Sequence, residues 1–184
     1  MDRAEALDLV NSWTVNKNLV KHMLCVEACM RALARHFHED ENLWGVTGLI
    51  HDADYDAHPD EHPWVLIKEL EKNNENPLMI QALKAHAWQW SEKSPEPSSN
   101  FDWSLYTCDE LSGLIVASAL VRPDRKLASV SVESVLKKFP DKGFAKGVHR
   151  EHIKLCEEKL GIALPEFVGI CLIAIQGISA DLGL

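Results

Sequence analysis

The chain has 184 residues, of which 46% are hydrophobic, and carries a net charge of −9 with a sequence pI near 5.4. This length and apolar content suffice for one domain with a buried core, and the acidic balance argues against a general nucleic-acid binder. The N-terminus does not resemble a signal peptide, and the longest apolar runs (111–121 and 170–175) are too short to cross a bilayer. Five cysteines, without zinc-ribbon spacing, indicate buried free thiols in a reduced, cytoplasmic protein.

The first three predicted elements are helices. A short amphipathic pattern covers residues 3–13, and a strong helical period runs from about 19 to 37. His22 lies on the apolar stripe of this second helix, where it could be either a hydrogen-bonded core residue or a ligand. A third helix begins near residue 41 and ends close to His51-Asp52. Adjacent side chains on a regular helix point about 100° apart, but at a helix end such a pair can converge on one metal ion.

The next segments alternate between loops and helices. A polar loop covers 54–61, His62-Pro63 opens a helix that runs to about residue 72, and Pro77 starts another in which His86 points inward. Residues 88–100 are rich in Ser, Pro and Glu, which predicts a flexible flap near the site.

The C-terminal half is also helical in pattern. A helix over 101–121 carries Asp109 on an otherwise apolar or small-residue stripe. A carboxylate on such a stripe needs a metal ion, an ion pair or hydrogen-bond donors. Shorter helices are expected over 123–160 and a final one over 165–179. No segment alternates with period two, so the predicted fold class is all-α.

The inward-facing polar residues suggest a metal site. Imidazole and carboxylate together suit a divalent transition metal such as Mn, Fe, Co, Ni or Zn. The order H…HD…D, with 29 residues from His22 to His51 and 57 from Asp52 to Asp109, resembles the HD superfamily of metal-dependent phosphohydrolases. The flanking runs 51–55 (HDADY), 109–115 (DELSGLI) and 121–123 (VRP) resemble a small group of predicted hydrolases within it.

This resemblance implies a helical bundle with additional C-terminal helices: one HD domain over 1–184, with a metal-binding core at about 15–121 and a helical extension over 122–184. It implies that His22, His51, Asp52 and Asp109 hold one metal ion. His62 and His86 match the extra histidines of members with two ions, in which Asp52 would bridge both ions and act as a catalytic residue. His58 is an equally plausible neighbour of His62. The histidines at positions 36, 38, 149 and 152 are interpreted as surface residues.

A small phosphorylated substrate would need cations beyond the metal. Residues 122–154 carry a net charge of +5, against −14 for the remainder of the chain. Such a segment is either a solvated face or a basic lobe that attracts an anion. Arg122, which follows the Asp109 helix, is the first candidate for substrate binding.

Three functions compete on this evidence. The first is a phosphomonoesterase, nucleotidase or phosphodiesterase that uses a metal-activated water. The second is a binuclear-iron oxygenase of the same fold that cleaves C–C or C–P bonds with O₂. The third is a degenerate binding module, against which the complete H…HD…D set argues. The sequence leaves the substrate, the native metal and the oligomeric state open.

Overall fold

The computed structural model describes all residues from Met1 to Leu184 and contains ten α-helices, one short 3₁₀ helix and no strand. The first five helices are α1 (Arg3–Trp13), α2 (Lys17–Phe37), α3 (Glu41–Ile50), α4 (Trp64–Lys72) and α5 (Pro77–His86). They are followed by α6 (Asn100–Leu120), η1 (Leu127–Ser129), α7 (Val132–Lys138), α8 (Arg150–Lys159), α9 (Leu164–Gln176) and α10 (Ser179–Leu182). The all-α prediction is confirmed.

Short polar residues start most of these helices. The side chains of Asn16, Asp40, Asn76 and Ser99 accept hydrogen bonds from backbone N–H groups in the first turns of α2, α3, α5 and α6. Each bond satisfies a donor that the helix leaves unpaired. The positions where these helices begin are therefore encoded by residues next to the first turn.

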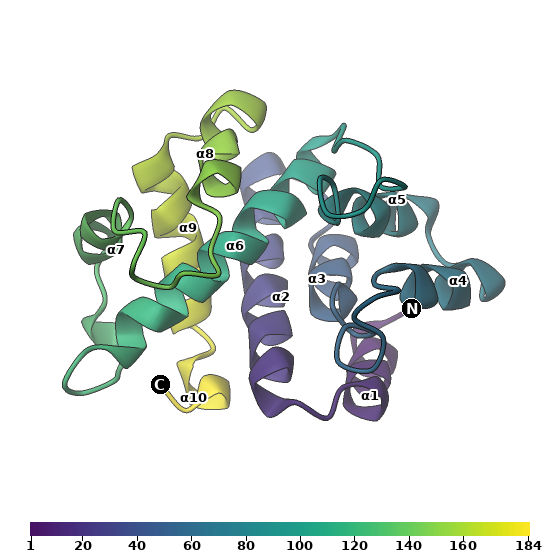
Figure 1. Ribbon diagram of the computed structural model, residues 1–184, viewed down its shortest axis with the longest axis horizontal. Coiled ribbons are helices and arrows are strands. Elements are labelled where there is room, and N and C mark those ends of the chain that lie inside the picture. The colour runs from purple at the N-terminus through teal and green to yellow at the C-terminus, as the bar shows by residue number, and fades with distance from the viewer.

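Two long helices, α2 and α6, form the centre of the molecule and cross each other (Figure 1). Helix α3 packs along α2, and α5 packs on α6, whereas α8 and α9 lie on the other side of the pair. A continuous apolar core joins these helices. All five cysteines are buried and free, as expected. No helix combines the length and the hydropathy needed to cross a membrane.

The close approach of α3 to α2 depends on a glycine. A Cβ atom at Gly48 would lie 3.0 Å from the backbone oxygen of Val26 and 2.9 Å from Cγ of Met30. Only a residue without a side chain fits at this distance without movement of a helix. This contact brings the end of α3, and with it His51, next to His22 on α2.

Candidate metal centre

The His51-Asp52 pair lies just past the end of α3. His51 caps that helix and is fully buried, and residues 51–57 continue as a series of turns. The ring Nδ1 of His51 donates to the carbonyl oxygen of Gly48 at 2.9 Å, so its Nε2 is the nitrogen left to bind a proton or a metal ion. That Nε2 atom is buried without a hydrogen-bond partner. The pair therefore lies at a helix end, as expected.

His22 of α2 and Asp109 of α6 approach the same point. His22 Nε2 lies 2.9 Å from Asp109 Oδ1, and His51 Nε2 lies 3.5 Å from that same oxygen. Ser112 donates its hydroxyl hydrogen to the Asp109 carbonyl at 2.8 Å, and its oxygen is 3.1 Å from His22 Nδ1. The hydroxyl oxygen therefore accepts from Nδ1, which leaves the His22 Nε2 lone pair directed at the carboxylate.

Asp52 connects two groups of histidines. Its Oδ2 lies 3.5 Å from His51 Nε2 and 3.8 Å from His22 Nε2. Its Oδ1 faces the other way, 3.3 Å from His62 Nε2 and 3.8 Å from His86 Nε2. Each oxygen thus faces one pair of imidazoles, which is the arrangement that a bridging carboxylate requires.

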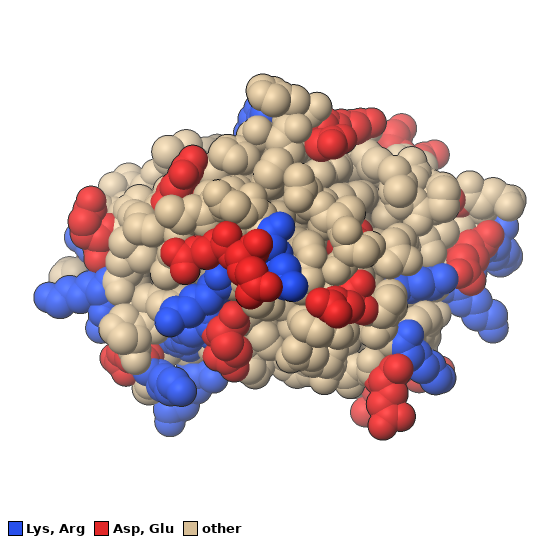
Figure 2. All heavy atoms as spheres, turned by 90° about the horizontal axis from the view of Figure 1, so that it is seen from above, with Lys and Arg blue, Asp and Glu red and all other residues tan.

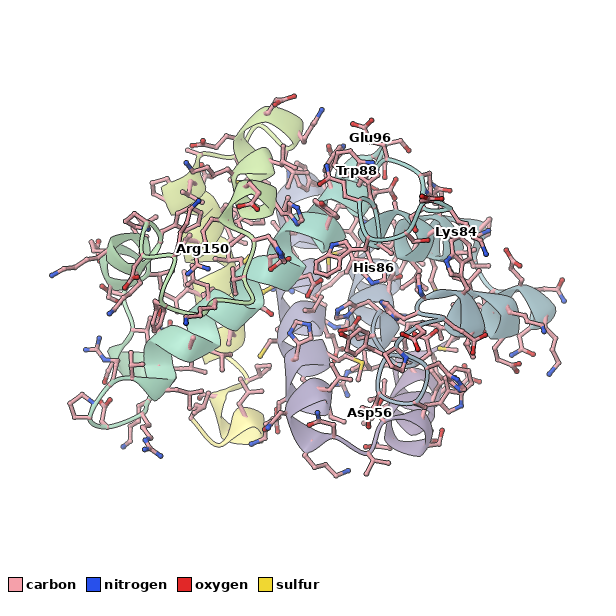
Figure 3. The ribbon with its side chains drawn as sticks, viewed as in Figure 1. Asp56, Lys84, His86, Trp88, Glu96 and Arg150 are labelled. Carbon is pink, nitrogen blue, oxygen red and sulfur yellow. The ribbon has the colours of Figure 1, made fainter.

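His86 and His62, the second pair of histidines, are also oriented by hydrogen bonds from Nδ1. His86, the last residue of α5, lies on its inner side (Figure 3) and donates from Nδ1 to the Leu83 carbonyl at 2.7 Å. His62 Nδ1 donates to Oδ1 of Asp54 at 2.6 Å, and Oδ2 of this buried aspartate accepts from the Leu66 backbone N–H at 2.9 Å. The two Nε2 atoms are then only 3.1 Å apart.

Charge is concentrated strongly in this cluster. Burial alone would lower the pKa of His51, but the carboxylates of Asp52 and Asp109 outweigh it and raise that pKa to about 9. Burial likewise opposes ionisation of both carboxyl groups, yet His51 and the other imidazoles hold the pKa of Asp52 and of Asp109 below the usual range. The carboxylates of the cluster therefore favour the binding of a cation, whether a proton or a metal ion.

The donor set fits a divalent transition metal. Four Nε2 atoms and two carboxylates face one another, and such donor atoms repel one another unless protons or a metal ion lie between them. Ligand bonds of about 2.0–2.2 Å at tetrahedral angles imply ligand–ligand distances of roughly 3.3–3.5 Å, close to those observed. Every imidazole is oriented through its Nδ1–H, a common feature of metal-binding histidines. Two three-residue groups could each hold an ion, His22-His51-Asp52 and Asp52-His62-His86.

The cluster opens into a cleft of about 600 Å³. Trp90, Ser91 and Lys93 from the loop after α5 line it, so this loop lies at the site, as expected for a flap. Of the two histidines in doubt, His62 lines the cleft, whereas the side chain of His58 is 45% exposed and approaches Glu61. The sequence alone did not distinguish between them.

Arg122 does not lie where the sequence analysis expected. It follows the C-terminal end of α6, thirteen residues after Asp109, which on a helix corresponds to about 20 Å. It is not among the residues that line the cleft. Arg122 follows the helix that carries Asp109, as expected, but the length of this helix separates the two side chains.

Of the two interpretations of the basic segment 122–154, the structure supports a solvated face and not a basic lobe at the cleft. None of the nine Lys and Arg residues of 122–154 lines the cleft. Arg150 is the first residue of α8, and its buried side chain lies inside the preceding loop (Figure 3), where it donates to carbonyl oxygens of Phe139, Asp141, Phe144, Ala145 and Val148. On the face drawn in Figure 2, basic and acidic side chains are intermingled, without a continuous basic patch. Lys93 is the only Lys or Arg that lines the cleft.

Some residues at the site were missed by sequence reasoning. Asp54 and Ser112 orient ring nitrogens, and Asp54 belongs to the HDADY run that was recognised without a role for this residue. His152 was interpreted as a surface residue but is only 8% exposed and lines the cleft. His149 is half-buried beside it. His36 and His38 are exposed, as expected.

Comparison with known proteins gives one match. No curated protein and no solved structure matched the chain. A family model described as the HD domain matches residues 19–117, a span that includes all six residues of the cluster. This match covers more than half of the chain. The protein belongs to the HD domain family.

Proposed function

We propose that the protein is a metal-dependent phosphohydrolase that acts on a small phosphorylated metabolite. HD domain proteins are typically metal-dependent hydrolases. The observation that carries the proposal is the position of Asp52, whose two carboxylate oxygens face two separate pairs of imidazole Nε2 atoms. Divalent ions held there would lower the pKa of a bound water towards neutrality and neutralise charge on a phosphoryl group.

Different side chains would hold the two ions. His22, His51 and Asp109 would hold one ion together with Asp52, while His62 and His86 would hold a second one. Ser112 and Asp54 would fix the orientation of His22 and His62 through the hydrogen bonds described above. Three of the ligands come from α2, the end of α5 and α6, and the other three from the turns between α3 and α4, so helices would support half of the centre.

The cleft suits a small anionic substrate. Its volume is within the range of pockets that bind small molecules. Its lining also contains acidic residues such as Asp60 and Glu110, so an anion would be attracted mainly by metal ions and by Lys93. Trp64 and Trp90 line the same cleft and could pack against the remainder of the substrate.

The test is phosphate release from a broad panel of phosphomonoesters and phosphodiesters. Chelator-treated protein would be reloaded with Mn²⁺, Co²⁺, Ni²⁺, Zn²⁺ or Fe²⁺. We expect turnover of at least one compound, abolished in Asp52→Ala and unchanged in Asp8→Asn, which alters an exposed carboxylate on α1. Metal-loaded protein that is inert with the entire panel would contradict the proposal.

One observation also favours an oxygenase with two irons. The six converging residues are four histidines and two aspartates, a set of donors that could hold two iron ions. Elemental analysis and EPR of aerobically purified protein separate the two functions. Two irons per chain with a mixed-valence signal would support the oxygenase, and an active iron-free protein would exclude it.

A further inference from the structure

A second group of ligand side chains lies on the wall of the same cleft, and it shares no residue with the Asp52 cluster. It consists of Glu110 on α6, His149 at the N-cap of α8 and His152 in the first turn of α8. Glu110 and His152 both line the cleft. Their side chains are 14% and 11% exposed, and that of His149 is 38% exposed, so the group is largely buried yet open to solvent.

The three side chains converge on one point. Glu110 Oε1 lies 2.8 Å from His149 Nδ1 and 3.6 Å from His152 Nδ1. These values bracket the roughly 3.3–3.5 Å expected between two ligands of a tetrahedral ion with bonds of about 2.0–2.2 Å. The backbone N–H of His149 donates to the other carboxylate oxygen at 2.9 Å and thereby fixes the orientation of Glu110. All three ligand atoms lie within 4.8 Å of one another, so adjustments of the side chains would place them around an ion.

Both imidazole rings are held in place by aromatic neighbours. The ring of His149 meets Trp90 edge-on at 5.1 Å between centroids, and the ring of His152 lies 4.9 Å from that of Tyr106. The two imidazoles also stack on each other at 5.1 Å. Ligands with restricted rings lose little conformational entropy when they bind an ion.

A hydrogen-bonded network alone accounts for only part of this arrangement. His149 Nδ1 is within hydrogen-bond distance of Glu110, but His152 Nδ1 at 3.6 Å is too far away. A carboxylate that only tied α8 to α6 would need one imidazole. A metal ion would use both of them, together with the carboxylate.

Tyr106 gives an independent indication. Tyr106 is only 3% exposed, and its ring lies against that of His152. Its hydroxyl is buried without a hydrogen-bond partner. An unpaired buried hydroxyl is unfavourable, because it has lost its hydrogen bonds to water. Burial raises the pKa of Tyr106, and the nearby Glu110 carboxylate raises it further. A solvent molecule bound to an ion in this group would provide the missing partner.

We propose that Glu110, His149 and His152 form a separate binding site for a divalent transition metal of the zinc type. Two imidazoles and one carboxylate suit Zn²⁺, Co²⁺ or Ni²⁺, and a fourth position would remain open towards the cleft. The site would be independent of the proposed hydrolase activity, because it has its own three ligands.

The experiment uses the full chain and Co²⁺ alone as the probe. Equilibrium dialysis with elemental analysis gives the number of ions per chain, and visible absorption reports their coordination. We expect His152→Gln and His149→Gln each to lose one Co²⁺ per chain relative to the wild type. The exposed His36→Gln is the matched control and should lose none. The reciprocal double variant Asp52→Ala/Asp109→Asn leaves at most two ligands at each of the other two groups, and it should still bind Co²⁺ through the Glu110 group.

The proposal is overturned if both single variants bind as many Co²⁺ ions as the wild type with equal affinity. A measurement on wild-type protein keeps the test independent of variant folding. Paramagnetic shifts of the His149 and His152 ring protons on Co²⁺ addition, still present in the double variant, support the site. Unshifted ring protons in saturated protein overturn it.

Discussion

Asp54 holds His62 through a 2.6 Å hydrogen bond from the ring Nδ1 to Oδ1, and its second oxygen accepts from the backbone of Leu66. The carboxylate is fully buried, so both of its oxygens are committed to these donors. The hydrogen bond between Asp54 and His62 fixes the direction of His62 Nε2. That direction determines whether a second ion can be held between His62, His86 and Asp52.

Asp54→Asn tests that relationship. An amide offers only one acceptor oxygen, so either His62 or the Leu66 N–H loses its partner. Outer partners of metal-binding histidines typically contribute about 10–100-fold to metal affinity. We therefore expect weaker binding at the His62-His86 group, measured as loss of the weaker ion in a titration, with the His22-His51-Asp109 group retained. Equal loss of both ions would show that Asp54 supports the whole centre.

Metal addition should stabilise the fold. An ion that binds only the native state contributes about 2.7 kcal/mol at a concentration one hundred times its dissociation constant. For a chain of this size that corresponds to a rise in Tm of about 5–10 °C. Differential scanning fluorimetry with Mn²⁺ measures the rise, and Asp52→Ala should largely abolish it. A full rise in that variant would locate the stabilising ion elsewhere.

The raised pKa of His51 predicts how the stability of chelator-treated protein depends on pH. The pKa rises from 6.5 to about 9 on folding, through the pull of Asp52 and Asp109 against burial. The folded state therefore binds the proton more tightly. The contribution of His51 to the free energy of unfolding is complete below pH 6.5 and is lost as the pH rises through 9. The Tm of metal-free protein should fall over this window.

His51→Gln is the control for this titration, because glutamine is neutral throughout. The fall in Tm between pH 6.5 and 9 should be smaller in the variant than in the wild type. Protons also compete with metal for the His51 Nε2 atom, so the rise in Tm caused by Mn²⁺ should grow with pH over the same window. Identical pH profiles of the two metal-free proteins would rule out His51 as the group responsible.

The helices and the six-residue cluster were predictable because their signals are local or periodic. Caps such as Asn16 and Asp40 mark where helices begin, and the apolar stripe of α2 shows which way His22 points. The Glu110 group was not predictable, because His149 and His152 reach Glu110 only through the packing of α8 on α6. Arg150 illustrates the same limit, since a count of charges does not reveal that its guanidinium turns inward to backbone carbonyls.

Lys93, rather than Arg122, should affect substrate binding. Lys93 lines the cleft, whereas Arg122 lies past the far end of α6. Because an exposed charge contributes up to about 1 kcal/mol, Lys93→Ala should raise KM about twofold to fivefold with little change in kcat. Arg122→Ala should leave both constants unchanged. A selective effect of Arg122→Ala on KM would restore the original expectation.

Gly48 should tolerate substitution poorly. In Gly48→Ala the new methyl group would press on the backbone oxygen of Val26 at 3.0 Å, which cannot rotate away. We expect a loss of about 1–3 kcal/mol in the free energy of unfolding. Gly48 also supplies the carbonyl that orients His51, so displacement of α3 should weaken metal binding as well.

Gly169→Ala on α9 is the matched control for this effect. Its methyl group would meet Cγ2 of Val132 at 3.7 Å, an ordinary van der Waals distance. Alanine should therefore stabilise that helix by about 0.5–1 kcal/mol. Urea denaturation of both variants measures the two opposite shifts. If Gly48→Ala proved as stable as the wild type, the close contact of α3 with α2 would not depend on glycine at this position.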